Sequence, residues 1–195
     1  IAKVLGSPVI RTFFGYIKER FFKHVTLKEQ IDATIKVLND VKDIAEEYNV
    51  KIALENHLEL TSYELLDLIK AVDSEYVGIC FDTGNPIILM EDPVEACKTL
   101  LPYIYTTHVK DGIIYSTDEG ARWAGVTLGD GFVDLASIFK LIYEAHPEVN
   151  LNLEDLWDTY SIPFFNRDFL ASLRHLDVLK MVEIVKLLRK ADNAI

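Results

Sequence analysis

The stretch GICFDTGN, residues 78–85, decides the fold. With Val77 before it, its first half forms a nearly unbroken apolar run, which is typical of a strand buried on both faces of a parallel sheet. Its second half is polar and places Asp82 immediately before the turn residues Thr83-Gly84-Asn85. The stretch therefore predicts a buried strand that delivers a carboxylate to one edge of a sheet.

Strand-like and helix-like segments alternate along the chain. The expected strands cover residues 9–14, 52–56, 77–82, 104–109 and 150–154. The longest helical pattern, residues 27–48, has one apolar stripe and begins at a Thr26–Glu29 capping box. Further helices are expected from Thr61 to about Val72, from Asp92-Pro93, from Asp134 to about Ala145, and from near Asp168 to Ala191. Five alternations of this kind predict parallel βαβ units and an α/β fold.

The polar residues that end these strands recur at a regular interval. Asp82 follows Glu55 by 27 residues and His108 follows Asp82 by 26, which is one βα unit in each case. Glu154 follows His108 by 46 residues, so this unit carries an insertion. The insertion, residues 112–133, is rich in Gly, Thr and Asp and is interpreted as a long functional loop.

Composition and charge limit the classes of function. The chain has 195 residues, is 50% hydrophobic and 26% charged, and is expected to form one domain over residues 1–195. Its formal net charge of −11 argues against a nucleic-acid partner and against docking on anionic lipid. It contains neither an apolar run of membrane-spanning length nor a signal-peptide pattern. The two cysteines, Cys80 and Cys97, are interpreted as reduced and structural, which favours a cytoplasmic protein.

The strand-end residues predict a metal site. All carboxyl ends of a parallel sheet lie at one edge, so Glu55, Asp82, His108 and Glu154 should converge there. Three carboxylates would repel one another strongly at close range, and a divalent cation removes that cost. Three oxygens and one imidazole suit Mn²⁺, Mg²⁺ or Co²⁺, and also admit Zn²⁺.

The motifs ALEN (53–56), GICFDTGN (78–85), THVKD (107–111) and LNLED (151–155), in this order, resemble the xylose isomerase-like (β/α)₈ TIM barrels. That group includes ketose 3-epimerases, inosose dehydratases and endonuclease IV. The resemblance extends from LGSPVIRTFFG, residues 5–15, to the last helix. It implies one divalent metal ion, with Mn²⁺ as the first choice, bound by Glu55, Asp82, His108 and Glu154. It also implies that Glu55 and Glu154 act as catalytic acid and base.

The chain departs from this pattern in length. The barrel needs eight strands and ~250 residues, whereas only five strands are counted here. The expected piece is therefore the C-terminal part of the barrel, about five βα units, with the first three missing from the protein or only from this chain. The opening IAKVLG, residues 1–6, resembles the end of a helix, in agreement with a start inside the fold. An open sheet would expose the edge of its first strand, which favours closure by the missing units or by a partner chain in a homo-oligomer.

The leading interpretation is a divalent-metal-dependent isomerase or epimerase of a sugar, a sugar phosphate or a cyclitol. A 3-epimerase removes a proton next to a carbonyl and returns it on the other face, which calls for two groups such as the two glutamates. The metal would hold the substrate oxygens and stabilise the enediolate intermediate. A dehydratase at the same site is a close variant, because it begins with the same proton abstraction.

Two other classes of function stay open. The first is a metal-dependent phosphodiester hydrolase resembling endonuclease IV. It would need several further histidine and carboxylate ligands, and the negative net charge argues against it. The second is a non-catalytic binding module built on an incomplete barrel. The four intact ligand positions argue against this second class.

Three residues near the strand ends are candidates for substrate binding. His57 could bond a sugar hydroxyl or, equally, be a structural residue of its loop. Lys110 lies two residues after His108 and so on the same side of the strand, where it contacts the substrate or a carboxylate, or forms a buried salt bridge. Arg122, in the insertion, could clamp a phosphate or a pair of hydroxyls, or lie in a solvated loop.

Aromatic and amide side chains form a second group of candidates. Trp123 could cover a sugar face or, like Arg122, lie in a solvated loop. Trp157 and Tyr160 could line the pocket or pack in the core. Asn56 and Asn85 could orient the metal ligands or serve only in turns.

Overall fold

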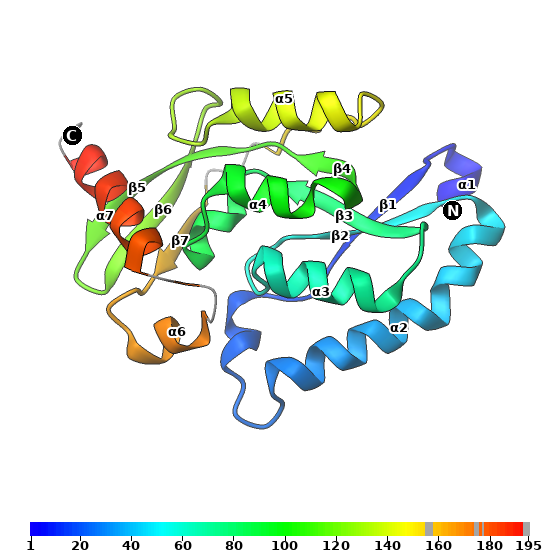
Figure 1. Ribbon diagram of the computed structural model, residues 1–195, viewed down its shortest axis with the longest axis horizontal. Coiled ribbons are helices and arrows are strands. Elements are labelled where there is room, and N and C mark those ends of the chain that lie inside the picture. The colour runs from blue at the N-terminus through cyan, green and yellow to red at the C-terminus, as the bar shows by residue number, and fades with distance from the viewer. Residues whose placement is uncertain (155–157, 174–175, 177, 193–195) are drawn as a thin grey trace.

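The computed structural model describes residues 1–192 except 155–157, 174–175 and 177. A four-stranded parallel sheet forms its centre, in the order β1 (Val9–Phe13), β2 (Lys51–Glu55), β3 (Val77–Asp82) and β4 (Ile104–His108). A three-stranded antiparallel sheet follows, in the order β5 (Asp111–Thr117), β6 (Gly120–Val126) and β7 (Thr159–Ile162). The two sheets lie end to end along the long axis of the molecule (Figure 1).

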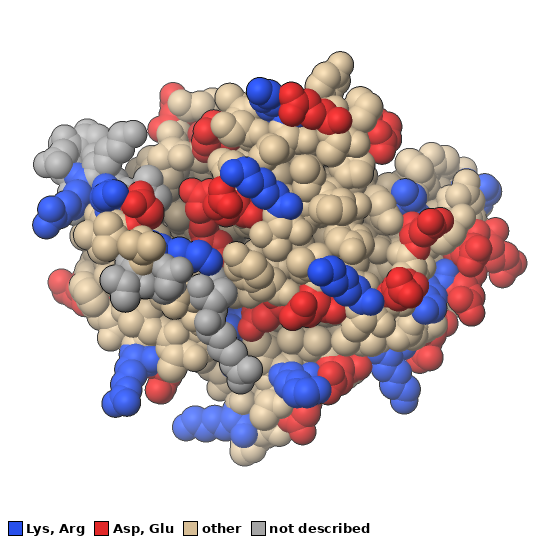
Figure 2. Space-filling model, viewed as in Figure 1, with Lys and Arg blue, Asp and Glu red and all other residues tan. Residues whose placement is uncertain are grey.

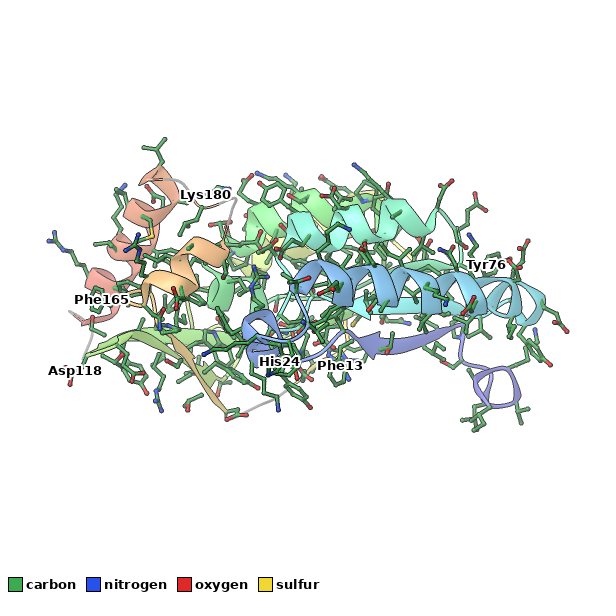
Figure 3. All side chains as sticks on the ribbon, turned by 90° about the horizontal axis from the view of Figure 1, so that it is seen from below. Phe13, His24, Tyr76, Asp118, Phe165 and Lys180 are labelled. Carbon is green, nitrogen blue, oxygen red and sulfur yellow. The ribbon has the colours of Figure 1, made fainter. Side chains whose placement is uncertain are left out.

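Four helices cover one face of the parallel sheet, and the first three of them connect its strands. They are α2 (Leu27–Tyr48), α3 (Ser62–Val72), α4 (Pro93–Leu100) and α5 (Leu135–Ala145). Figures 1 and 3 show α3 and α4 on the same side of the strands. The capping signals in the sequence are confirmed, because Thr26 with Glu29 and Thr61 with Glu64 both form capping boxes. Capping fixes where each helix starts, and therefore how long the preceding strand-to-helix loop is.

The remaining helices are short or lie at the ends of the chain. The helix α1 (Ala2–Leu5) ends at Gly6, whose φ of 72° is the left-handed conformation that glycine adopts at low cost. Three 3₁₀ helices follow parallel strands or α4: η1 (Ile17–Phe21), η2 (Asn85–Leu89) and η3 (Leu101–Tyr103). The last two helices are α6 (Arg167–Ser172) and α7 (Val178–Asp192). The prediction of one helix from Asp168 to Ala191 was therefore wrong, and residues 174, 175 and 177 between the two lie outside the described part.

Side-chain alternation divides the parallel sheet into two faces. Ile52 and Leu54 of β2 and Ile79 and Phe81 of β3 pack with the helices in one hydrophobic core. The residues between them in sequence, such as Ala53, point to the opposite face, because successive side chains of a strand alternate. A second hydrophobic cluster joins the antiparallel sheet to η2, α6 and α7. The face of the parallel sheet turned away from the helices therefore carries the polar strand ends.

Two further predictions about the strands were wrong. Residues 150–154 do not form a regular strand. They run parallel to the end of β4 and form a single bridge, Val109 to Leu153, with Val109 N–H donating to the Asn152 carbonyl at 2.7 Å. The insertion over residues 112–133 is largely ordered as the hairpin β5–β6, and not as a long loop. Its alternating apolar residues, such as Ile114 opposite Trp123, pack into the second cluster.

Charge and hydropathy agree with the composition. In the part of the chain that the model describes, every helix is too short or too polar to cross a bilayer. Lys and Arg side chains alternate with Asp and Glu over the helix-covered face shown in Figure 2. Cys80 and Cys97 are buried free thiols.

Candidate metal centre

Four polar side chains converge at the carboxyl edge of the parallel sheet. Glu55 ends β2, Asp82 ends β3, His108 ends β4, and Glu154 follows the bridge beside β4. Each offers one ligand atom, and these atoms all lie within 4.8 Å of one another. The strand register explains the convergence, because Asp82 is paired directly with His108 in the parallel ladder.

Asp82 and His108 present atoms that suit a metal ion. Asp82 Oδ1 accepts the backbone N–H groups of Gly84 at 2.8 Å and Asn85 at 2.9 Å, so Oδ2 is the oxygen left for a ligand. Asp82 Oδ2 and His108 Nδ1 are buried and make no well-directed hydrogen bond with the described residues. They have charged neighbours instead: Lys110 Nζ lies 2.8 Å from Oδ2, and Glu154 Oε1 lies 3.3 Å from Nδ1. Buried polar atoms without hydrogen bonds are costly. A divalent cation would take the place of these ion pairs, and a carboxylate oxygen and an imidazole nitrogen are atoms that such ions bind, so the donor set fits the predicted metal.

His108 lies between the two glutamates. Its Nδ1 is 3.3 Å from Glu154 Oε1 and 3.5 Å from Glu55 Oε1. These two carboxylates raise the pKa of His108 to about 9. The same contact, together with Lys110, holds the pKa of Glu154 well below its ordinary value. The imidazolium therefore supplies positive charge at the centre of the cluster, and a metal ion would replace its proton.

The other two carboxylates are almost fully buried. Burial raises the pKa of Asp82 to about 6, although Lys110 opposes that shift. For Glu55, burial would raise the pKa, but His108 and Arg11 outweigh it and the pKa lies below its ordinary value. Burial favours the protonated form of both carboxylates, and the neighbouring cations favour the ionised form. The cations beside each carboxylate therefore determine its protonation state.

Two cationic side chains contact the cluster. Lys110 Nζ is 2.8 Å from Asp82 Oδ2 and 2.9 Å from Glu154 Oε2, so the structure places it in contact with carboxylates, one of the predicted alternatives. Arg11, on β1, binds Glu55 Oε2 through both Nε and Nη2. The sequence analysis missed Arg11. Its contact with Glu55 depends on the pairing of β1 with β2, in which Arg11 is in register with Ala53, so no local signal in the sequence reveals it.

His57 lies beside the cluster in a structural arrangement. Its Nδ1 is 2.8 Å from the Gly15 carbonyl and 3.3 Å from Glu59 Oε2. Its ring packs against Phe13 and Tyr16, with centroid distances of 4.7 and 5.3 Å. Both partners hold the ring at the end of β1, so a substrate contact by His57 stays a prediction.

Arg122 and the aromatic candidates lie on the antiparallel sheet. Arg122 is exposed on β6, opposite Ser161, and the structure does not bring it to the cluster. Trp123 is fully buried, because it packs against Tyr160 at 5.7 Å and lies 5.9 Å from Lys110 Nζ. Trp123 is therefore a buried residue packed beside Lys110, and it has no exposed ring face with which to cover a sugar. Trp157 lies outside the described residues.

Side chains extend the sheet hydrogen bonding past the strand ends. Asn56 bridges β2 and β3, because its amide donates to the Asp82 carbonyl at 2.9 Å and its oxygen accepts the Asp82 N–H at 2.6 Å. The Thr83 hydroxyl donates to the Lys110 carbonyl at 2.6 Å and accepts the Lys110 N–H at 2.9 Å. The Thr107 hydroxyl links β4 to residues 150–152 in the same way. The sequence predicted this orienting role as one alternative for Asn56, and it missed both threonines.

Comparison with known proteins identifies a family whose match includes the four clustered residues. The model of a family described as xylose isomerase-like TIM barrel matches residues 1–177. The chain is 26% identical to 3-oxo-isoapionate decarboxylase of Pectobacterium atrosepticum, over 84% of this chain and 63% of that protein. It is 28% identical to an inosose dehydratase of Clostridium botulinum, over 77% of this chain and 58% of that protein. The chain thus spans less than two thirds of these curated relatives.

Solved structures share the fold. One is a xylose isomerase-like TIM barrel protein from Mycobacterium smegmatis in complex with magnesium, with a TM-score of 0.66 and 20% identity over 97% of this chain and 64% of that chain. Another is a D-tagatose 3-epimerase-like protein, with a TM-score of 0.59 and 23% identity over 97% of this chain and 66% of that chain. At these identities the likeness concerns the fold alone.

Proposed function

This chain belongs to the xylose isomerase-like TIM barrel family, and from that premise we propose that it carries the metal centre of a divalent-metal-dependent isomerase or epimerase. The substrate class would be a sugar, a sugar phosphate or a cyclitol. The family match confirms the fold predicted from the strand-end motifs. The observation that carries the functional proposal is the convergence of Glu55, Asp82, His108 and Glu154 within 4.8 Å.

These four side chains would hold the ion, with Mn²⁺ as the first candidate and Mg²⁺, Co²⁺ or Zn²⁺ as alternatives. The ion would polarise a substrate carbonyl and so make the neighbouring C–H group acidic. Asp82 is suited to be a fixed ligand, because two backbone N–H groups hold its Oδ1. His108 Nδ1 lies in the same cluster, 3.3 Å from Glu154 Oε1.

Glu55 and Glu154 would move the proton. They lie on either side of His108, with their Oε1 atoms 3.5 and 3.3 Å from its Nδ1. A substrate carbon held near this ring would have a carboxylate on each side, which is the arrangement that removal and return of a proton on opposite faces requires. His57 and Lys110 would border the substrate. Arg122 would take part only through a substrate that extends to the antiparallel sheet.

Dehydration is the second candidate, because the chain is 28% identical to an inosose dehydratase. It would use the same glutamates, one to take the proton next to the carbonyl and one to protonate the departing hydroxyl. The hydrolase alternative has less support. Among the described residues, metal-competent clusters are limited to this one and an overlapping Glu55–Cys80–His108 group, whereas a site like that of endonuclease IV needs several more ligands.

Metal content tests the proposal directly. Protein expressed from the full reading frame would be dialysed without chelator and measured by elemental mass spectrometry, beside His108→Ala. His146→Ala is the matched control, because His146 bonds the Leu101 carbonyl at 2.8 Å at the end of α5, outside the cluster. We expect about one divalent ion per chain in the wild type and in the control, and its loss in His108→Ala.

Two outcomes would contradict the proposal. If the wild type binds no divalent ion even after addition of Mn²⁺, the metal centre does not form and a binding module becomes the better reading. Three zinc ions per chain would instead favour the hydrolase. If one ion binds, a panel of ketoses and cyclitols in D₂O, followed by NMR, identifies the substrate carbon that exchanges its hydrogen.

A further inference from the structure

Lys110 is held rigidly inside the candidate metal centre. Its side chain is 5% exposed. The Thr83 hydroxyl bonds both the N–H and the carbonyl of Lys110, which fixes its backbone against the end of β3. A Cβ atom on residue 84 would lie 2.9 Å from Lys110 Cγ, so Gly84 is needed for the stem to pass. The buried ring of Trp123 lies behind the ammonium group. These contacts define one position for the ammonium group.

In this position the ammonium group contacts the Asp82 oxygen that a metal ion would also bind. Asp82 Oδ1 is taken by two backbone N–H groups, so Oδ2 is the oxygen that a metal would bind. Lys110 Nζ lies 2.8 Å from this same Oδ2 and 2.9 Å from Glu154 Oε2. The ammonium therefore bridges two of the four proposed ligands, and it neutralises the buried charge of Asp82.

Arg11 provides the contrast. Among the carboxylates of the described residues its guanidinium binds Glu55 alone, from β1, on the opposite side of Glu55 from β3, and it stacks over the Phe13 ring at 4.8 Å. It is also one third exposed. Arg11 therefore orients one ligand from outside the cluster, whereas Lys110 joins two ligands.

We propose that Lys110 is an internal counter-ion of the metal centre, which keeps Asp82 and Glu154 together before a metal ion binds and competes with that ion for them. The inference rests on the proposed function only in that these four side chains bind a divalent cation. The ammonium makes the metal-free site stable, and in exchange it weakens metal affinity, because two cations at the same oxygen repel.

The test compares Lys110→Met with the wild type, using Mn²⁺ alone as the probe. Isothermal titration calorimetry would give the Kd for Mn²⁺, and thermal unfolding with chelator or with Mn²⁺ would give the stability of each state. We expect Lys110→Met to bind Mn²⁺ at least about tenfold more tightly, since a neighbouring positive charge is removed. We also expect its Tm to be lower than that of the wild type in chelator and to rise more on addition of Mn²⁺.

Lys98→Met is the matched control. Lys98 forms an exposed ion pair with Glu95 at 2.7 Å on α4, so the same substitution there should leave both measurements unchanged. A Lys110→Met protein that folds only with Mn²⁺ also supports the proposal, because the metal then replaces the ammonium.

Other outcomes overturn the proposal in distinguishable ways. If the wild type binds Mn²⁺ and Lys110→Met binds it equally or more weakly, the counter-ion idea is wrong while the proposed function stands. If neither protein binds Mn²⁺, both proposals are wrong. Lys110→Gln, which keeps a hydrogen-bond donor without the charge, covers a failure of Lys110→Met to fold. If both variants stay unfolded with Mn²⁺, the ammonium has a role that a metal cannot fill, and the proposal is overturned.

Discussion

Glu55 and Glu154 were predicted to have the same roles, yet the two sides of the site hold them by different means. Glu55 ends a regular strand that is paired on both sides, and its side chain is 1% exposed. Glu154 follows a single bridge to β4 and is 25% exposed. Each directs Oε1 toward His108, but Arg11 binds the other oxygen of Glu55 whereas Lys110 binds that of Glu154.

The difference in backbone pairing and exposure suggests a different task for each glutamate in the proposed site. A ligand fixed in a closed ladder keeps the metal position constant, because its backbone has no freedom to shift. A ligand on a short bridge is accessible to water and substrate, and it is restrained chiefly by side-chain hydrogen bonds. We therefore expect the Glu55 side to set the geometry and the Glu154 side to admit the substrate.

The strongest test of this comparison is Glu154→Gln. The substitution preserves shape but removes the carboxylate that would move the proton, so we expect turnover to fall about a thousandfold while the fold is kept. Glu148→Gln is the control, because Glu148 is 74% exposed with only a 3.8 Å contact to His146. Turnover would be measured with the substrate found by NMR, and folding by circular dichroism. If Glu154→Gln kept normal proton exchange next to the substrate carbonyl, its acid–base role would be wrong.

The comparison also shows what the sequence could reveal. Glu55, Asp82 and His108 each end a short β-rich segment, and the regular spacing of βα units placed them together correctly. The capping boxes likewise predicted where α2 and α3 begin. These features are local, so the pattern of neighbouring residues is sufficient to recognise them.

The missed features depend on contacts between distant segments. The insertion was interpreted as a loop because Gly, Thr and Asp obscure the alternation that Ile114 and Trp123 form only when the hairpin packs. Residues 150–154, NLNLE, alternate polar and apolar side chains as a strand does, but only one pair joins the ladder. Arg11 acts 44 residues away in sequence, on Glu55, which no local pattern reports.

A further glutamate, Glu91, is buried and sharpens the comparison, since its pKa shifts in the opposite direction. The carboxylate of Glu91 accepts two hydrogen bonds from Ser62 at the start of α3, one from the backbone N–H at 2.8 Å and one from the side-chain hydroxyl at 2.5 Å. Burial raises the pKa of Glu91 to about 7 from an ordinary value of 4.5. The folded state therefore holds the proton more tightly, so this stabilisation is present below about pH 4.5 and is lost as the pH rises through about 7.

Glu91→Gln should remove this dependence, because the amide imitates the protonated acid. We expect its stability advantage over the wild type to grow by about 2 to 3 kcal/mol between pH 5 and pH 8. Urea unfolding in the presence of chelator at both values would measure it. A variant that is less stable than the wild type at pH 8 would show that the charged form of Glu91 is needed in the fold.

The smallest expected effect concerns the bridge that carries Glu154. The buried Thr107 hydroxyl donates to the Asn150 carbonyl at 2.9 Å and accepts the Asn152 N–H at 3.1 Å. Thr107→Val keeps the volume and removes both bonds, so we expect a loss of about 1 to 2 kcal/mol in the free energy of unfolding. Thr99→Val is the control, since its hydroxyl bonds the Glu95 carbonyl at 2.9 Å on the exposed side of α4, and it should change stability by less than about 0.5 kcal/mol.

Metal affinity decides what Thr107 does beyond stability. If the bridge positions Glu154, Thr107→Val should weaken Mn²⁺ binding several-fold, because one of four ligands is then less well oriented. Unchanged affinity together with reduced stability would mean that the backbone pair of Val109 with residues 152–154 is sufficient to hold Glu154. Glu55 on its strand and Glu154 beside its single bridge would then be equally well fixed, and accessibility alone would distinguish the two sides of the site.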